Sequence, residues 1–95
     1  MQLARFLNNV FKKDGFILVD ANSKSYIIGN PKSENPIKVK ILNKNLHYKL
    51  LFHPDLYFGE AYTDGEITIE NGTLTDFLDL SLMNFGRGDL NFFSY

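Results

Sequence analysis

The stretch GFILVDANSKSYIIGNPKSENPIKVKI, residues 15–41, places three strand patterns one after another with no helix between them. GFILVD and SYIIGN are rich in β-branched and aromatic residues and flank the turn-forming ANSK, which predicts a hairpin. A loop bracketed by Pro31 and Pro36 follows, and then IKVKILN alternates with the period of two that a half-buried strand shows. We expect its outward Lys38 and Lys40 to protect an edge of the sheet from association.

A helical pattern precedes these strands. Five apolar residues near the N-terminus follow the spacing of an amphipathic helix, namely Leu3, Phe6, Leu7, Val10 and Phe11. We expect Lys12 and Lys13 in the last turn of this helix, where cations favour the helix dipole, and Asp14-Gly15 at its end.

Two more helices are expected after the third strand. KNLHYKLLFH, residues 44–53, returns to helical spacing through Leu46 and Leu50. Its apolar face is broadened by Tyr48, Leu51 and Phe52. Pro54 should end or kink this helix, and Asp55 is then placed to cap the next one, LYFGEAY.

The remaining patterns complete the element order. DGEITIENG reads as turn, strand and turn, and Thr73 opens a last helix with Asp76 in a capping-box position. The apolar stripe of that helix comprises Leu74, Phe77, Leu78 and Leu82, widened by Leu80 and Met83. The order helix, three strands, two helices, strand, helix lacks the alternation of doubly wound folds. We therefore expect an α+β domain with a small antiparallel or mixed sheet and helices packed on one face.

Composition indicates one folded domain. The chain has 95 residues, 44% of them hydrophobic, which is far from the composition of disordered segments. It has no cysteine, which excludes disulfides and thiolate chemistry. No apolar run reaches the length of a membrane span, and the N-terminal residues lack the apolar core of a signal peptide, so we expect a cytoplasmic protein.

Charge is distributed unevenly along the chain. Residues 1–49 carry nine Lys or Arg and three Asp or Glu, whereas residues 50–95 carry one arginine and eight acids. Either the basic half meets an anionic partner such as phospholipid headgroups, or the two halves mix their charges over one surface. The candidate headgroup contacts are Arg5, Lys12, Lys13, Lys38 and Lys40. Nucleic acid is not an expected partner, because the chain is slightly acidic and no aromatic–basic platform recurs.

The sequence carries no strong catalytic or metal motif. His47 and His53 are six residues apart, which is not the i, i+4 spacing of a helical metal pair, and no glycine-rich phosphate loop is present. Glu60, Asp64 and Glu66 could supply a general acid and base, but Asp64 belongs to a turn and Glu66 begins a strand. We expect Glu60 to be partly buried and to hold this turn. Gly65 should need a positive φ.

Residues 53–84 resemble the N-terminal domain of the cyclopropane-fatty-acyl-phospholipid synthase family, which are S-adenosylmethionine-dependent methyltransferases acting on unsaturated lipid chains. The hairpin GFILVD…YIIG and the lysine-studded strand resemble that domain as well. The matching positions are Pro54-Asp55, Gly59-Glu60-Ala61-Tyr62 and Asp64-Gly65, with Thr63 where the family commonly has methionine. The resemblance thus spans nearly the whole chain.

This resemblance implies a non-catalytic accessory domain over residues 1–84, with residues 85–95 as a linker to a catalytic domain. It implies a fold like that of sterol-carrier proteins, with no catalytic, cofactor or metal residue in this chain. S-adenosylmethionine and the catalytic residues are expected in the catalytic domain. The implied roles are positioning the enzyme on phospholipid, peripheral to the inner membrane, and packing against the catalytic domain or a second subunit in a homodimer.

Two alternatives remain open from the sequence. One is a protein-interaction module that does not touch lipid and docks the aromatics of Phe92–Tyr95 on a catalytic domain. The other is a small lipid carrier with a pocket between the helices and the sheet.

Overall fold

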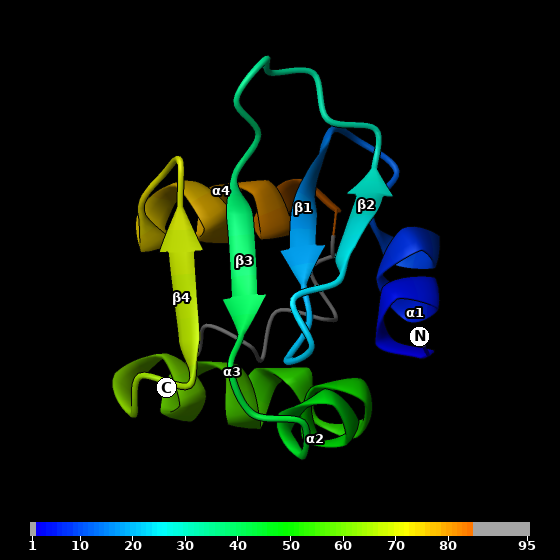
Figure 1. Cartoon of the computed structure of the whole chain (residues 1–95). Coiled ribbons are helices and arrows are strands. Elements are labelled where there is room, and N and C mark those ends of the chain that lie inside the picture. The colour runs from blue at the N-terminus through cyan, green and yellow to red at the C-terminus, as the bar shows by residue number, and fades with distance from the viewer. Residues whose placement is uncertain (1, 85–95) are drawn as a thin grey trace.

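The computed structural model describes residues 2–84, which form four helices and one four-stranded sheet. The expected order of elements is confirmed (Figure 1). The elements are α1 (Gln2–Val10), β1 (Gly15–Val19), β2 (Ser25–Gly29), β3 (Lys38–Ile41), α2 (Leu46–Phe52), α3 (Pro54–Thr63), β4 (Ile67–Glu70) and α4 (Leu74–Asn84). The linker expected at 85–95 and its tail aromatics lie outside the described residues.

The sheet is mixed, with strand order β2-β1-β3-β4. β1 and β2 form the expected antiparallel hairpin, and β3 and β4 also pair antiparallel. The loop after β2 returns the chain across the sheet, so β3 lies parallel to β1. β3 is therefore an interior strand, and the expectation that Lys38 and Lys40 protect an edge was wrong. Lys40 instead forms an ion pair with Glu70 of the neighbouring strand, with 2.7 Å between Nζ and Oε2.

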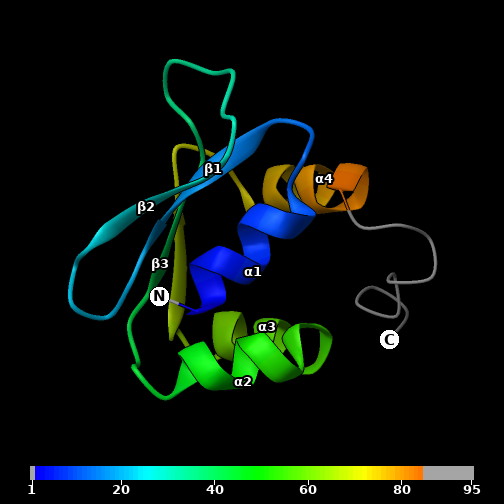
Figure 2. The ribbon, with the colours of Figure 1, turned by 90° about the vertical axis from the view of Figure 1, so that its right-hand side faces the viewer.

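All four helices cover the same face of the sheet (Figure 2). The side chains that point toward them share one parity along each strand, and they are Phe16, Leu18, Ile28, Val39, Ile41 and Ile67. Three aromatic contacts extend this core through the helix layer: Phe16 packs edge-on against Phe11 and Phe77, and Phe77 stacks on Phe58. Within residues 2–84, no helix lies on the other face of the sheet.

Two helix ends differ from the expectation. α1 ends at Val10, so Lys12 and Lys13 lie beyond its last turn, although Phe11 is still buried in the core. α3 begins at Pro54, with His53 at the N-cap position, and Asp55 lies inside the first turn rather than capping it. Proline favours the first helical position because its missing N–H would have no partner there.

α4 begins with the expected capping box. The Thr73 hydroxyl accepts the Asp76 N–H at 3.1 Å, and the Asp76 carboxylate accepts the Thr73 N–H at 2.9 Å. Its buried face differs from the expected stripe, because Leu82 and Met83 are exposed while Ser81 is buried. The Ser81 hydroxyl donates to the Phe77 carbonyl four residues earlier, which satisfies it inside the apolar layer.

α1 is fixed to the sheet edge by one side chain. The Asn8 amide oxygen accepts the Gly29 N–H at 2.8 Å, and its Nδ2 donates to the Ile27 carbonyl at 3.4 Å. These are the edge groups of β2 that a further strand would otherwise bind.

Candidate interaction surface on α2 and α3

The four residues Gly59-Glu60-Ala61-Tyr62 of the family-like motif lie on α3 and divide between core and surface, and Asp64 and Gly65 follow in the turn after this helix. Ala61 is buried beside Phe58 and packs toward the sheet. Gly59, Glu60 and Tyr62 are exposed. Packing within the domain therefore explains only Ala61 of these four positions, and the other three form a surface. The side chains of residues 54–56 are outside the described part of the structure.

Gly59 is a glycine in a helix interior, and the described residues give no packing reason for its missing side chain. It is the sixth residue of the ten in α3. Apart from the backbone of its own helix and its two chain neighbours, no heavy atom of the described residues lies within 4 Å of a Cβ added there. Glycine in a helix interior is less stable than alanine by about 0.8–1.0 kcal/mol. The sequence thus gives up stability at a position where the described residues leave open space.

The turn after α3 is held by backbone hydrogen bonds. The Asp64 N–H donates to the Glu60 carbonyl at 2.9 Å and the Gly65 N–H to the Tyr62 carbonyl at 3.2 Å. Gly65 has φ +78°, which confirms the expected left-handed conformation. The Glu60 side chain is exposed, so the expected partial burial was wrong, and only its backbone carbonyl holds the turn. Glu66 has a partner of its own, because its carboxylate accepts the Asn43 amide at 3.1 Å.

A small hollow of about 110 Å³ lies between α2 and α3. Its walls are Leu46, Lys49, Tyr57, Glu60, Ala61, Asp64 and Glu66. The Lys49 ammonium lies 5.3 Å from the centre of the Tyr57 ring, a cation–π distance. The exposed motif residues therefore adjoin a mixed aromatic and charged rim.

α2 carries two exposed aromatic side chains on one face. Tyr48 and Phe52 are four residues apart, which places them one above the other, and they are 63% and 70% exposed. The sequence reading, which assigned both to the apolar face, was wrong. Each lies two residues, about 200° of helical rotation, beyond the buried Leu46 and Leu50, and that spacing was the signal that could have placed them outside.

The two histidines do not meet. His47 is half-buried, its Nε2 is shielded from solvent and no hydrogen-bond partner for it is found among the described residues. Burial, opposed by the charge of Asp20, lowers the pKa of His47. His53 is exposed, and its ring lies 6.2 Å from that of Tyr57. Residues 2–84 contain no group of three or more side chains that could hold a metal ion.

Asp20 is the one buried carboxylate of the described core, 8% exposed at the end of β1. Its oxygens accept the N–H groups of Asn22 and Lys24, each at 2.9 Å, and the Tyr26 hydroxyl at 3.2 Å. Burial tends to raise the pKa of Asp20, but these hydrogen bonds and nearby His47 outweigh it, so the pKa is lowered. Asp20 thus organises the β1–β2 turn.

The five candidate headgroup residues do not gather on one surface. Lys38 and Lys40 point to the outer face of the sheet, where they border a hollow of about 380 Å³. Arg5 is exposed on α1, in the helix layer that covers the opposite face. Lys12 and Lys13 follow α1, where the Asn84 side chain bonds both backbone groups of Lys13. A headgroup surface built from all five residues is therefore not formed.

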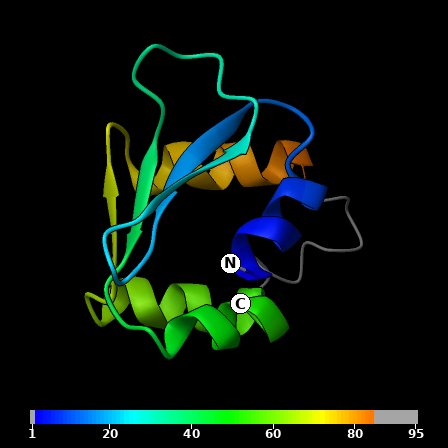
Figure 3. The ribbon, with the colours of Figure 1, turned by 45° about the vertical axis from the view of Figure 1, so that its right-hand side comes forward.

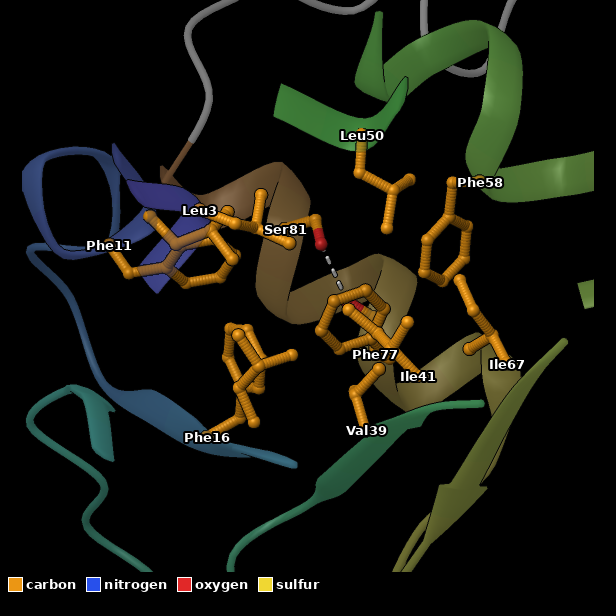
Figure 4. Close-up of a pocket in the computed structure, with 12 residues that line it drawn as sticks. Leu3, Phe11, Phe16, Val39, Ile41, Leu50, Phe58, Ile67, Phe77 and Ser81 are labelled. Carbon is orange, nitrogen blue, oxygen red and sulfur yellow. Dashed lines mark hydrogen bonds between the residues drawn. The ribbon is translucent and has the colours of Figure 1, made fainter. Parts of the chain in front are cut away.

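A cavity of about 50 Å³ lies in the core between the sheet and the helices (Figure 4). Its walls are apolar, with Leu50 and Phe58 from α2 and α3 facing Val39 and Ile41 of β3. Ser81 is the polar residue of the lining, and its hydroxyl is bonded to the Phe77 carbonyl. A cavity of about 150 Å³ is needed to hold benzene, so this one does not fit an acyl chain.

None of the helices within residues 2–84 has the length and apolar character needed to cross a membrane. Comparisons of the chain with protein-family models, with curated proteins and with solved structures found no match.

Proposed function

We propose that this chain is a non-catalytic accessory domain of a lipid-modifying methyltransferase of the cyclopropane-fatty-acyl-phospholipid synthase type. It positions the enzyme on phospholipid and packs against the catalytic domain through the exposed side of α3. The observation that carries the docking part is Gly59, a helix-interior glycine beside which the described residues leave open space where its side chain would be.

An uncovered glycine in a helix is explained when another backbone or side chain must come close to it. The exposed neighbours of Gly59 suit such a contact. Tyr62 offers a large ring with a polar end, the type of side chain enriched in binding hot spots. Glu60 and the hollow beside it add a polar rim. Docking through this surface requires no catalytic residue in the domain itself.

Genomic context tests the family assignment. The coding sequence after Tyr95, or the adjacent gene, should encode a methyltransferase domain whose first strand ends in a glycine-rich cofactor loop. A natural gene neighbourhood that lacks such a domain would overturn the assignment.

Titration calorimetry with that catalytic domain tests the surface. Tyr62→Ser should weaken association about tenfold or more, as expected for an interface tyrosine. Met83→Ser is the matched control, because Met83 is also exposed but lies on α4. Equal affinities for the two variants would refute docking through α3.

The structure offers less support for a lipid carrier. The core cavity of about 50 Å³ would have to grow severalfold to enclose an acyl chain. The protein-interaction alternative docks Phe92–Tyr95 on a catalytic domain without touching lipid, and those residues lie outside the described part of the structure.

A further inference from the structure

We infer that α1 and α2 form a membrane-docking face that binds anionic phospholipid, with Tyr48 and Phe52 as interfacial anchors. This inference rests on the part of the proposed function that places the domain on phospholipid. Of the headgroup residues expected from the sequence, this face keeps Arg5, Lys12 and Lys13 and leaves out Lys38 and Lys40, which lie on the outer face of the sheet.

The four helices divide into a basic pair, α1 and α2, and an acidic pair, α3 and α4. Residues 2–13 and 42–53, which include α1 and α2, contain no Asp or Glu. Their exposed cations are Arg5, Lys12, Lys13, Lys44 and Lys49. α3 and α4 contain acidic residues and no Lys or Arg. The basic and acidic residues of the helix layer thus lie on different helices, and they meet at the hollow that Lys49 shares with Glu60 and Asp64.

The two basic helices lie side by side. α1 and α2 contact each other, and both face the viewer in Figure 2. Figure 3 shows them on the same side of the molecule, while α4 runs behind the sheet. On the α3 side, the face ends at Lys49, which borders the hollow with Glu60 and Asp64.

The exposed side chains of α2 match what a bilayer interface binds. Tyr48 and Phe52 are the two exposed aromatics of this helix, and they project from the side opposite its buried leucines. Aromatic rings favour the headgroup region, and nearby lysines are attracted to anionic lipids. A positive, aromatic face whose own helices α1 and α2 carry no carboxylate therefore fits an anionic bilayer better than an acidic or neutral partner.

Vesicle sedimentation of the whole chain tests this inference. The chain should bind vesicles of equal parts phosphatidylglycerol and phosphatidylcholine at about 0.01 M salt and release them at about 1 M, where screening reaches about 3 Å. Phe52→Ser should lower the partition coefficient about tenfold, because it removes most of the apolar side chain that inserts into the bilayer. The double variant with Lys44→Gln and Lys49→Gln should lower the partition coefficient about thirtyfold, because it removes the attraction of two lysines to the anionic surface.

Matched controls come from parts of the molecule away from this face. Ile27→Ser removes a side chain that is 66% exposed on the outer face of the sheet, and Lys32→Gln removes a cation from the β2–β3 loop. Both controls should bind vesicles like the natural chain. Because all substituted side chains are exposed, thermal midpoints should stay unchanged.

Fluorescence gives an independent readout that does not depend on weakened binding. The chain has no tryptophan, so Phe52→Trp introduces a single probe at the proposed anchor. Its emission should shift to the blue on vesicle addition, whereas that of Ile27→Trp should not. A shift at Ile27 alone, or equal binding by Phe52→Ser, would overturn this face while leaving phospholipid positioning intact.

Two other outcomes have different meanings. If the chain binds no anionic vesicle at low salt, both the face and the phospholipid part of the proposed function fail, while docking on the methyltransferase stands on its own test. If sedimentation equilibrium shows a dimer that Phe52→Ser dissociates, the face is occupied by a second copy and the inference is wrong.

Discussion

Replacing Gly59 by alanine should raise the stability of the fold and weaken docking on the catalytic domain. Its position in the α3 interior predicts a gain of about 0.8–1.0 kcal/mol from helix propensity. No clash with the described residues subtracts from this gain, because the new Cβ has none of their atoms within 4 Å beyond its own helix backbone and chain neighbours. For a domain of this size the midpoint of thermal unfolding should rise by about 4–8 °C.

The two effects are measured on the same protein preparation. Circular dichroism during urea and thermal unfolding gives the stability change, and calorimetry with the catalytic domain gives the affinity. Glu60→Ala is a suitable companion variant, since Glu60 is the exposed neighbour in the same helix and its replacement should change stability by less than about 0.5 kcal/mol.

For Gly59→Ala, a rise in stability together with a loss of affinity for the catalytic domain is the result that supports the reasoning. A lower midpoint for Gly59→Ala would refute the reading of open space around this residue. A higher midpoint with unchanged affinity would refute the idea that the space serves a partner, because the glycine would then have no docking role.

Three further predictions concern the fold. Gly65→Ala should destabilise by about 1–2 kcal/mol in urea unfolding, since φ +78° is unfavourable for alanine, and an unchanged midpoint would contradict this. The free energy of unfolding should fall as pH drops below 6.5, because the unfolded chain protonates His47 at a higher pH than the folded chain does. It should fall further below pH 3.8, because the unfolded chain also protonates Asp20 first. His47→Gln should abolish the loss that begins at pH 6.5, whereas His53→Gln should retain it. Thr73→Ala should cost about 1 kcal/mol in thermal unfolding through loss of the α4 N-cap, and a midpoint within error of the natural chain would exclude the cap as a stabilising contact.

The element order could be read from the sequence because each signal was local. The strand runs around Phe16 and Ile28 and the capping box at Thr73 depend on residues close in the chain. The parallel pairing of β1 with β3 depends on how the loop crosses the sheet, and no local pattern specifies it. The interior position of Lys38 and Lys40 follows from that pairing and was missed for the same reason.

The candidate surface was predicted less well than the fold. The motif around Gly59 was found, but the sequence suggested a partly buried Glu60, whereas the turn is held by backbone groups and leaves the carboxylate exposed. Tyr48 and Phe52 were assigned to the apolar face because their side chains are largely apolar. In a helix of only seven residues, apolar character alone does not show which side faces the core. The direction of the Tyr48 and Phe52 side chains depends on how α2 is rotated about its axis. The buried Leu46 and Leu50 fix that rotation only once the side of α2 that packs on the core is known.

The bonds from Asn8 to β2 have a chemical consequence for the ageing of the protein. One carboxamide supplies both a donor and an acceptor to the sheet edge. Hydrolytic deamidation to aspartate would remove the donor and set a negative oxygen against the Ile27 carbonyl. The new carboxylate would still accept the Gly29 N–H, but it would leave the Ile27 carbonyl at the edge of β2 without its donor, as a group that a strand from another molecule can bind. The change would be visible as a one-dalton mass increase, and light scattering that rises after it would show association through this edge.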